Sequence, residues 1–250
     1  MNQVVSVNPG ACAAAGLALV IGAGGGLGAA LVGQLASGQG QSDAYPAVLS
    51  LSRGTQPPLD YLDEASVLAA SRWVAAQRAE LQLELRLLVV ASGFLHGEQG
   101  QPERSLSQLD ADYLTHVFRI NAIGPALVMK HFLPLMPKQG RCVAAFVSAK
   151  VGSIADNALG GWYGYRASKA ALNQFTKTAS IELTRRNRQS VCVALHPGTV
   201  DTGLSQPFAK TGLSVRPAKV AAAELLNVLA GLNALDTGSF RDYRGNVVPW

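Results

Sequence analysis

The sequence is poor in cysteine, and the cysteines that it has form no pairing motif. Its 250 residues include three, Cys12, Cys142 and Cys192, which are far apart and contain no Cys-x-x-Cys spacing. Disulfide frameworks and redox motifs depend on closely spaced cysteines. We therefore expect buried or free thiols in a reducing compartment, with the cytoplasm as the location.

The chain also lacks a basic leader and an unbroken apolar run. Its first thirty residues are apolar, but the first basic residue is Arg53. Six glycines between Gly16 and Gly28 would interrupt any continuous spanning helix. We therefore expect neither a signal peptide nor a membrane-spanning segment, and no membrane partner.

Charged residues are scarce as well. They make up 15% of the sequence against 48% hydrophobic residues, which is typical of a folded chain rather than a disordered one. The net charge is +5, and the sequence contains no dense cluster of Lys and Arg, so we expect no nucleic-acid partner. The length fits one large α/β domain or two small ones.

What the sequence does contain is a regular alternation of short apolar runs and longer amphipathic stretches. Strands are predicted at 17–21, 47–51, a short segment before Asp60, 86–91, 141–147, 190–195 and near Phe240. Helices are predicted at 27–35, 65–81, 109–136 with an interruption near Gly124 and Pro125, 165–184 and 217–232. Fully apolar strands between helices indicate a parallel sheet covered on both faces. We predict a Rossmann-type, doubly wound α/β fold of about seven strands, whose ligands lie at the carboxyl ends of the strands.

A glycine-rich turn follows the first predicted strand and opens a helix. It contains Gly22, Gly24, Gly26 and Gly28, with Leu27 between the last two. Such a turn lets the backbone approach a pyrophosphate, whose charge the helix N-terminus favours. Glycine-rich turns also occur where only close packing is needed. The turn by itself is therefore compatible with binding a pyrophosphate and with a purely structural role.

The second predicted strand ends at Leu51 and is followed by Ser52 and Arg53. An acidic residue there would bind an adenosine ribose and repel a 2′-phosphate, whereas Arg53 can pair with that phosphate and Ser52 can add a hydroxyl. The pattern favours NADP over NAD, although Arg53 is also compatible with an ordinary surface arginine. Asp60 could accept a hydrogen bond from the adenine amino group.

Tyr165 and Lys169 lie four residues apart at the start of a predicted helix, so they share one face. A phenol titrates near pH 10, and an ammonium one turn away would lower that pKa, as would an oxidised nicotinamide. The pair makes chemical sense as a proton donor to a carbonyl oxygen that receives a hydride. Two polar groups at a wet surface would have the same spacing.

Four motifs resemble those of the short-chain dehydrogenase/reductase family. They are the Gly22/Gly26/Gly28 turn, Asn121 in Ile-Asn-Ala-Ile-Gly, Tyr165-Arg-Ala-Ser-Lys169 and His196-Pro-Gly-Thr-Val-Asp-Thr202. The stretch 151–166 and the ending 238–250 are similar to the C-factor-like and sniffer-like branch of that family. The resemblance covers nearly the full length and implies one NAD(P)-binding domain over residues 1–250.

The resemblance implies a role for each matching position. Tyr165 would be the general acid in reduction and the base in oxidation, and Lys169 would bind the nicotinamide ribose and tune Tyr165. Asn121, at a helix interruption, would hold a water that relays protons to Lys169, or would merely be a helix-kink residue. The remaining cofactor contacts would come from Gly93, Pro197, Gly198, Val200 and Thr202. His196 is expected to be a strand-end residue, and no metal site is expected because no second His or Cys has ligand spacing.

The sequence departs from the family pattern at three places. Ile21 replaces the usual threonine before the glycine turn, and the segment 90–93, Val-Ala-Ser-Gly, replaces the usual Asn-Asn-Ala-Gly. Ala149 stands where the family has the serine that polarises the substrate carbonyl. Ser148 or Ser153 could serve instead, and we favour Ser148; losing such a donor typically costs about 100-fold in rate.

These residues lead to one main functional hypothesis and two alternatives. The main one is an NADP-dependent oxidoreductase of the short-chain dehydrogenase/reductase type, acting on a small-molecule carbonyl or alcohol. The first alternative is a weakly active or inactive NADP-binding protein for signalling or redox sensing, and the second is a methyltransferase that binds S-adenosylmethionine.

Two further expectations concern the surroundings of the site and the assembly. The residues expected to border the substrate are Phe94, His96, Trp162, Tyr163 and the segment 200–208. The resemblance implies a homodimer or homotetramer packed through the helices 109–136 and 165–184.

Overall fold

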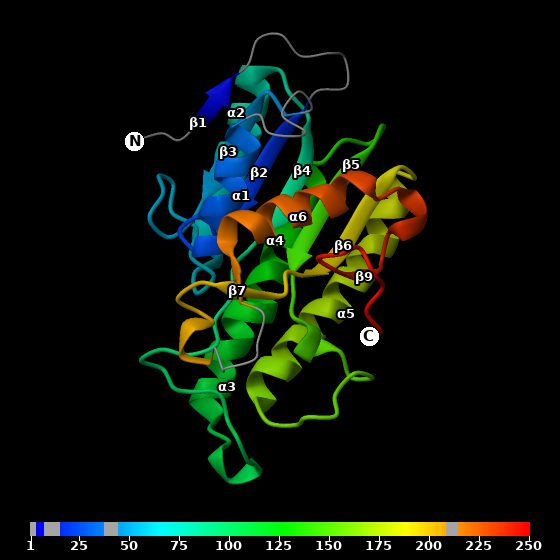
Figure 1. Ribbon diagram of the computed structural model, residues 1–250. Helices are drawn as coiled ribbons and strands as arrows, with labels where there is room; N and C mark the ends of the chain where they lie inside the picture. Colours follow the sequence, from blue (N-terminus) through cyan, green and yellow to red (C-terminus); the bar gives the residue numbers. More distant parts are fainter. Residues whose placement is uncertain (1–3, 8–15, 38–44, 209–214) are drawn as a thin grey trace.

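The structure is a computed structural model, and it describes residues 4–7, 16–37, 45–208 and 215–250 (Figure 1). For residues 4–7 only the backbone is described. Cys12 lies outside the described residues, whereas Cys142 and Cys192 are buried and free, as expected.

The core of the fold is a seven-stranded sheet in the order β1-β3-β2-β4-β5-β6-β9. Its strands are β1 (Val4–Val7), β2 (Leu17–Ile21), β3 (Ala47–Leu51), β4 (Leu85–Val90), β5 (Cys142–Val147), β6 (Ser190–His196) and β9 (Phe240–Asp242). The six strands from β3 to β9 run parallel, and β1 is added antiparallel at the β3 edge. The chain leaves β2 for β3 on one side and then returns to β4 on the other. This reversal places the topological switch point at the carboxyl ends of β2 and β4.

Helices cover both faces of the sheet. One face carries α1 (Gly26–Ala36) and α6 (Ala218–Gly231), and the other carries α2 (Glu64–Leu81), α4 (Gly124–Phe132) and α5 (Tyr163–Arg186). In Figure 1, α6 (orange) crosses the sheet on the α1 side. The inner strands β2, β3 and β5 are buried along their whole length because both of their faces are covered, which explains their almost entirely apolar sequences. The predicted doubly wound α/β fold is confirmed.

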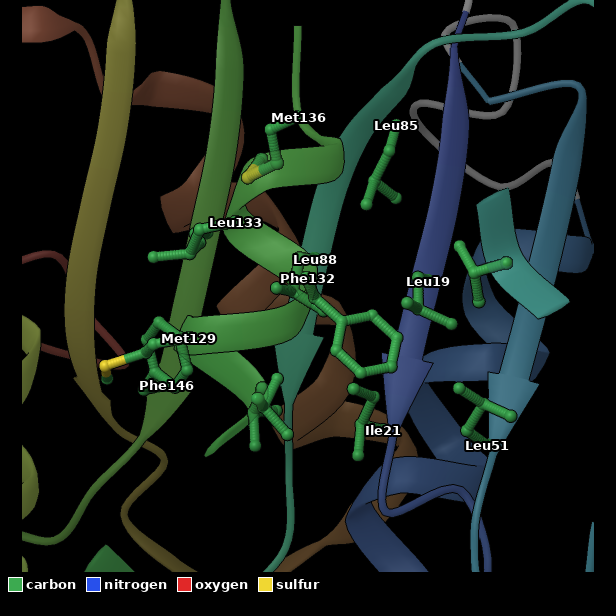
Figure 2. Packing of buried hydrophobic residues seen from close by; sticks show 14 of the residues in the cluster. Leu19, Ile21, Leu51, Leu85, Leu88, Met129, Phe132, Leu133, Met136 and Phe146 are labelled. Carbon is green, nitrogen blue, oxygen red and sulfur yellow. The ribbon is translucent and has the colours of Figure 1, made fainter. Parts of the chain in front are cut away.

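The α4 side of the core is filled by large side chains. Figure 2 shows the ring of Phe132 extending from α4 toward β2, where Leu19 and Ile21 lie, with Leu88 of β4 beside it. All four side chains are inaccessible to solvent. Burying a side chain of this size contributes about 1.5–3 kcal/mol, so this layer holds α4 firmly on the sheet.

In the main sheet, one predicted strand is absent and one observed strand was not foreseen. The segment before Asp60 forms no strand, because its backbone is used in local turns: the Ser52 carbonyl accepts from Thr55 N–H at 3.3 Å and from Leu59 N–H at 2.9 Å. Pro57 and Pro58 also lack the N–H that a strand would donate. The seventh strand is instead Val4–Val7, whose pairing with β3 joins distant parts of the chain.

The predicted helix 109–136 is divided close to where the sequence suggested. After α3 (Ala111–Phe118), residues Arg119–Ile123 form a π-turn, and α4 then begins at Gly124. Asn121 lies inside this π-turn, a feature that occurs often at functional sites. A small two-stranded sheet, β7 (Thr199–Asp201) with β8 (Val215–Pro217), lies beyond the end of β6. No helix in the described part of the chain is long and apolar enough to cross a bilayer.

Candidate active site

The glycine turn after β2 is packed so closely that side chains would not fit. A Cβ on Gly28 would lie 2.2 Å from the Gly22 carbonyl oxygen, and a Cβ on Gly26 would lie 2.9 Å from Cγ2 of Thr202. Gly22 itself has a φ of +91°, which favours glycine. The turn therefore brings the start of α1 and the segment after β7 into direct contact.

Helix α1 offers an open N-terminus at this turn. Its N-cap residue is Gly25, which supplies no side-chain cap, and the first turn contains no acidic residue. The first N–H groups of a helix have no partner within the helix, and the helix dipole favours an anion there. Leu27 is buried beneath the turn. The donor set and the space left by the missing Cβ atoms suit a diphosphate.

The structure places Ser52 at the glycine turn, whereas Arg53 and Asp60 are less constrained. Ser52 Oγ lies 3.6 Å from the position a Cβ would take on Gly24, and it accepts from Gly54 N–H at 3.2 Å. Arg53 is exposed, and no ion pair joins it to another described residue. The Asp60 carboxylate accepts from Leu62 N–H at 3.0 Å.

A tyrosine that the sequence analysis did not single out supports the end of β4. The Tyr61 hydroxyl lies 2.9 Å from Ser92 Oγ, and its ring fills the space beside Gly124, where a Cβ would lie 2.2 Å from Tyr61 Cγ. Burial raises the pKa of Tyr61 above its ordinary value, so it stays a neutral hydroxyl. This bond supports the segment 90–93, where the sequence departs from the Asn-Asn-Ala-Gly pattern. In the sequence, Gly124 is the residue whose small size indicates that another group packs closely there.

Asn121 fixes the loop that follows β4. Its amide oxygen accepts from Phe94 N–H at 2.8 Å, and its nitrogen donates to the Phe94 carbonyl at 2.8 Å and to Ser168 Oγ at 3.1 Å. A Cβ on Gly93 would lie 3.6 Å from Lys169 Nζ and 3.7 Å from Asn121 Oδ1. Gly93, Asn121 and Lys169 are therefore brought together at the carboxyl end of β4.

Tyr165 and Lys169 share one buried face of α5. Lys169 Nζ lies 5.9 Å from the centre of the Tyr165 ring and donates to the Val147 carbonyl at 3.0 Å. Burial lowers the pKa of Lys169 to about 8, so the ammonium is still largely protonated at neutral pH.

The direction expected for the Tyr165 pKa is not found in the protein alone. Burial raises the pKa of Tyr165, and the phenol is only 6% exposed. The Lys169 ammonium lies 5.9 Å from the centre of the ring, and desolvation of the buried phenolate sets the direction of the shift. The net lowering of the Tyr165 pKa that was expected is therefore not found, and the general acid–base role of Tyr165 stays a prediction.

Both serines near Ala149 direct their hydroxyls at internal acceptors. Ser148 Oγ donates to Asn173 Oδ1 at 2.6 Å. Ser153 Oγ donates weakly to the Trp250 carbonyl at 3.4 Å and accepts from Asp156 N–H at 3.1 Å. Both side chains are buried. Which of them faces a substrate stays a prediction.

Aromatic rings gather beside Tyr165. The Trp162 ring lies 6.1 Å from the Tyr165 ring and 5.2 Å from that of Phe208, measured between centroids. His96 packs edge-on against Phe208 at 5.3 Å, and its Nε2 donates to the Gly203 carbonyl at 3.0 Å. The structure thus brings together His96, Trp162 and Phe208, three of the positions expected to border the substrate.

The segment after β6 turns sharply at Pro197 and Gly198, where Gly198 has a φ of +76°. A Cβ on Gly198 would lie 3.1 Å from Arg216 Nη1 and 3.1 Å from the Tyr243 ring. Arg216 stacks on Tyr243 at 3.5 Å and forms an ion pair with Glu224. Sequence reasoning missed this support, because Gly198 and its partners Arg216 and Tyr243 lie in segments that are separated along the chain.

The remaining predicted positions near this turn are consistent with packing roles. Val200 is buried in the core cluster on the α1 and α6 side, and Thr202 contacts Gly26. His196 ends β6, and burial lowers its pKa to about 4, so it is neutral at pH 7. No group of three or more His, Cys, Asp or Glu in the described part of the chain could hold a metal ion.

Comparisons with known proteins agree with this geometry. Residues 56–212 match the sequence model described as short chain dehydrogenase. The C-signal protein of Myxococcus xanthus is 40% identical over 143 residues, which are 56% of this chain and 82% of that protein.

Solved structures with the same arrangement include two carbonyl reductases. One, from chicken fatty liver and solved with NADPH bound, is 26% identical with a TM-score of 0.78, covering 94% of this chain and 98% of the other. The other, Sniffer of D. melanogaster, is 22% identical with a TM-score of 0.73 over 94% of this chain and 99% of the other, and shows the fold alone.

Proposed function

The chain belongs to the short-chain dehydrogenase family of oxidoreductases, and we propose that it is an NADP-dependent carbonyl reductase or alcohol dehydrogenase. The observation that carries the proposal is the meeting of Tyr165, Lys169, Asn121 and Gly93 beside the glycine turn at the switch point. An acid, a cation and a close backbone approach are what hydride transfer to a carbonyl requires from the protein.

The cofactor that we propose is NADP rather than NAD. Arg53, which is exposed, would provide a cation for a 2′-phosphate, and Ser52, which lies beside the glycine turn, would provide a hydroxyl. The open N-terminus of α1 would hold the diphosphate, and Gly198, Val200 and Thr202 would border the nicotinamide end. The chicken carbonyl reductase, solved with NADPH, supports the same choice.

The protein groups divide the work of the reaction between them. NADPH, when bound, supplies the hydride to the carbonyl carbon. Tyr165 donates the proton to the carbonyl oxygen, and Lys169 stabilises the phenolate that remains and binds the nicotinamide ribose. Burial lowers the Lys169 pKa only to about 8, so its charge is present at neutral pH. Asn121 positions the loop after β4. We propose that its π-turn also holds a water that supplies a proton to Lys169 when Lys169 passes its own proton to the Tyr165 phenolate.

We propose that Ser148 polarises the substrate carbonyl in place of the serine missing at Ala149. The Ser148 hydroxyl lies directly after β5, next to the Val147 carbonyl that binds Lys169. To donate to a substrate it would have to leave Asn173 Oδ1. Polarisation is therefore weaker than from a free hydroxyl, and turnover is expected to be modest.

The aromatic rings indicate what kind of carbonyl compound is bound. Trp162, Phe208 and His96 form a wall beside Tyr165, and the first two present apolar ring surface. Such a wall suits a substrate with a flat apolar group next to the carbonyl.

A second candidate function is an NADP-binding sensor with little turnover. The hydrogen bonds of Ser148 and Ser153 favour it. Neither Ser148 nor Ser153 directs its hydroxyl hydrogen toward Tyr165, since each donates to another group. The sensor hypothesis predicts tight NADPH binding without oxidation by any carbonyl.

We also propose a homodimer or homotetramer and a cytoplasmic location. Phe175 and Ile181 are exposed on α5 by 41% and 48%, and Ile123 before α4 by 42%. These apolar side chains suit a contact between copies through α4 and α5. The location rests on Cys142 and Cys192, which are free thiols. Light scattering of the purified protein tests the assembly.

The proposed activity is tested by titrating the protein with NADPH and NADH, followed by a screen of aldehydes, ketones and quinones for NADPH oxidation. Binding of NADPH with oxidation by a carbonyl supports the reductase. Binding without oxidation favours the sensor, and no binding of either nucleotide refutes both.

A further inference from the structure

Glu103 is an unusual acidic residue. Its side chain is 2% exposed, and it is the one acidic side chain among the described residues that is fully buried. Both carboxylate oxygens face the same backbone group, Gly164 N–H, at 3.2 and 3.1 Å. Burying a carboxylate costs free energy unless the group is paired. A carboxylate that is buried against a single N–H group therefore indicates a specific structural role.

The position that Glu103 occupies is the first turn of α5. The N-cap residue of this helix, Trp162, provides no side-chain hydrogen bond, and the first turn contains no acidic residue of its own. Glu103, 61 positions earlier in the chain than Gly164, supplies the missing acceptor. A negative group at a helix N-terminus stabilises the helix by about 0.3–1 kcal/mol at exposed sites and more when partly buried.

The backbone of Glu103 makes a second contact with the start of α5, at residues 160–164, which we call the corner. Its carbonyl accepts from Trp162 N–H at 2.5 Å. Trp162 has a φ of 53° and a ψ of 45°, a left-handed conformation that is a genuine outlier for a bulky residue. Such a conformation persists only where its surroundings enforce it.

Arg166 makes further contacts with the residues just before α5. Arg166 donates from Nε to the Gly161 carbonyl at 2.9 Å and from Nη2 to the Gly160 carbonyl at 3.1 Å. A Cβ on Gly164 would lie 3.0 Å from Glu103 Oε1. The start of α5 is thus held by Glu103, and the loop that leads into it is held by Arg166.

What this corner positions is the reactive part of the proposed site. Tyr165 directly follows Gly164, and the Trp162 ring packs edge-on against the Tyr165 ring at 6.1 Å and 79°. A shift of the first turn of α5 would move the phenol and the aromatic wall together. Displacements of about 1 Å can cost about 100-fold in rate.

We propose that Glu103 is a positioning residue, which clamps the first turn of α5 so that Tyr165 and Trp162 keep their places beside the substrate. It does not touch the reacting atoms. This inference rests on the proposed function for its catalytic consequence, but the clamp itself is a structural statement that can be tested without turnover.

The clamp is tested by amide hydrogen exchange on Glu103→Ala and Glu103→Gln. In Glu103→Ala we expect residues 162–166 to exchange at least about tenfold faster, while the residues 172–184 of the same helix keep their protection. Glu103→Gln keeps an amide oxygen that can accept from Gly164 N–H, so its exchange should be close to that of the wild type. Unchanged exchange at 162–166 in Glu103→Ala would refute the clamp, as would a uniform loss of protection along α5.

The catalytic consequence is tested on the same variants with NADPH and a carbonyl that the wild type reduces. We expect Glu103→Ala to lower kcat by about 10- to 100-fold with the NADPH Kd changed less than twofold, and Glu103→Gln to restore most of kcat. Glu80→Ala and Glu80→Gln, at an exposed position on α2, are the matched controls. An unchanged kcat in Glu103→Ala, or a loss of NADPH affinity equal to the loss of kcat, would overturn the proposal.

The two experiments separate the failure of the clamp from the failure of the proposed function. If the wild type turns over no carbonyl while exchange behaves as described, the function is wrong and the clamp stands. If the wild type is active and neither exchange nor kcat responds to Glu103→Ala, the clamp is wrong and the function stands.

Discussion

The ammonium of Lys169 lies 5.9 Å from the centre of the Tyr165 ring, and both side chains are almost completely buried. Burial opposes charge on each of them, raising the pKa of Tyr165 and lowering that of Lys169. The pair is therefore held as a neutral phenol next to a cation, which is the state that the proposed proton donation from Tyr165 requires.

The first prediction concerns the pH dependence of stability. Burial lowers the folded-state pKa of Lys169 to about 8 from 10.5, so between these values the unfolded chain binds more protons. The contribution of Lys169 to the free energy of unfolding should therefore rise with pH from about 8 to about 10.5. At pH 7, Lys169→Met should be more stable than the wild type by up to about 3 kcal/mol, less the lost bond to Val147.

This prediction is checked by urea unfolding of the wild type and Lys169→Met at pH 7 and pH 10, where the difference should shrink. Lys138→Met, at an exposed position, should show no such change between the two pH values. A Lys169→Met variant that is less stable than the wild type at pH 7 would contradict the reasoning.

The second prediction contrasts two glycines of α1. A Cβ on Gly28 would lie 2.2 Å from the Gly22 carbonyl, whereas a Cβ on Gly33 would meet nothing within 4 Å. Gly28→Ala should lower the free energy of unfolding by about 1–3 kcal/mol and weaken NADPH binding by about tenfold. Gly33→Ala should raise the free energy of unfolding by about 0.4–1 kcal/mol and leave binding unchanged. Chemical unfolding and fluorescence titration measure both; equal effects of the two variants would disprove the packing argument.

The third prediction concerns the choice between NADP and NAD. Arg53 is exposed beside Ser52, so reversing its charge should repel a 2′-phosphate without disturbing the fold. Arg53→Glu should raise the Kd for NADPH by about 10- to 100-fold and change that for NADH by less than about threefold. Arg188→Glu, exposed in the turn before β6, carries the same charge reversal as a control. Parallel weakening of NADPH and NADH by Arg53→Glu would show that Arg53 does not read the phosphate.

The fourth prediction tests which serine replaces the one missing at Ala149. Ser148→Ala should lower kcat by about 100-fold with NADPH affinity retained, while Ser153→Ala should stay within about threefold of the wild type. Steady-state kinetics with one reducible carbonyl measures both. The reverse order of effects would transfer the role to Ser153.

Much of this architecture can be predicted from local sequence, and the exceptions are long-range contacts. Leu17–Ile21 and Cys142–Val147 are uninterrupted apolar runs, so their burial on both faces of a sheet follows from composition alone. The bond from Tyr61 to Ser92 and that from Gly164 to Glu103 join residues 31 and 61 positions apart. The residues next to each of these groups in the sequence do not indicate which distant residue it will bond to.

The same distinction explains the errors in the site. The expected pKa of Tyr165 was reasoned from its spacing to Lys169, but burial, which depends on the whole fold, decides its direction. The expected strand before Asp60 failed because Ser52 and Thr55 draw that backbone into turns. The spacing along the helix correctly predicted that Tyr165 and Lys169 lie close together. It could not predict how deeply the two side chains are buried.

The most direct test of the account compares the wild type with Tyr165→Phe for NADPH binding and for carbonyl reduction. Removing the phenol hydroxyl should lower kcat by about 100- to 10,000-fold, because it removes the general acid, and should leave the NADPH Kd within about twofold. A wild-type enzyme whose turnover survives Tyr165→Phe unchanged would contradict the assignment of Tyr165 as the proton donor.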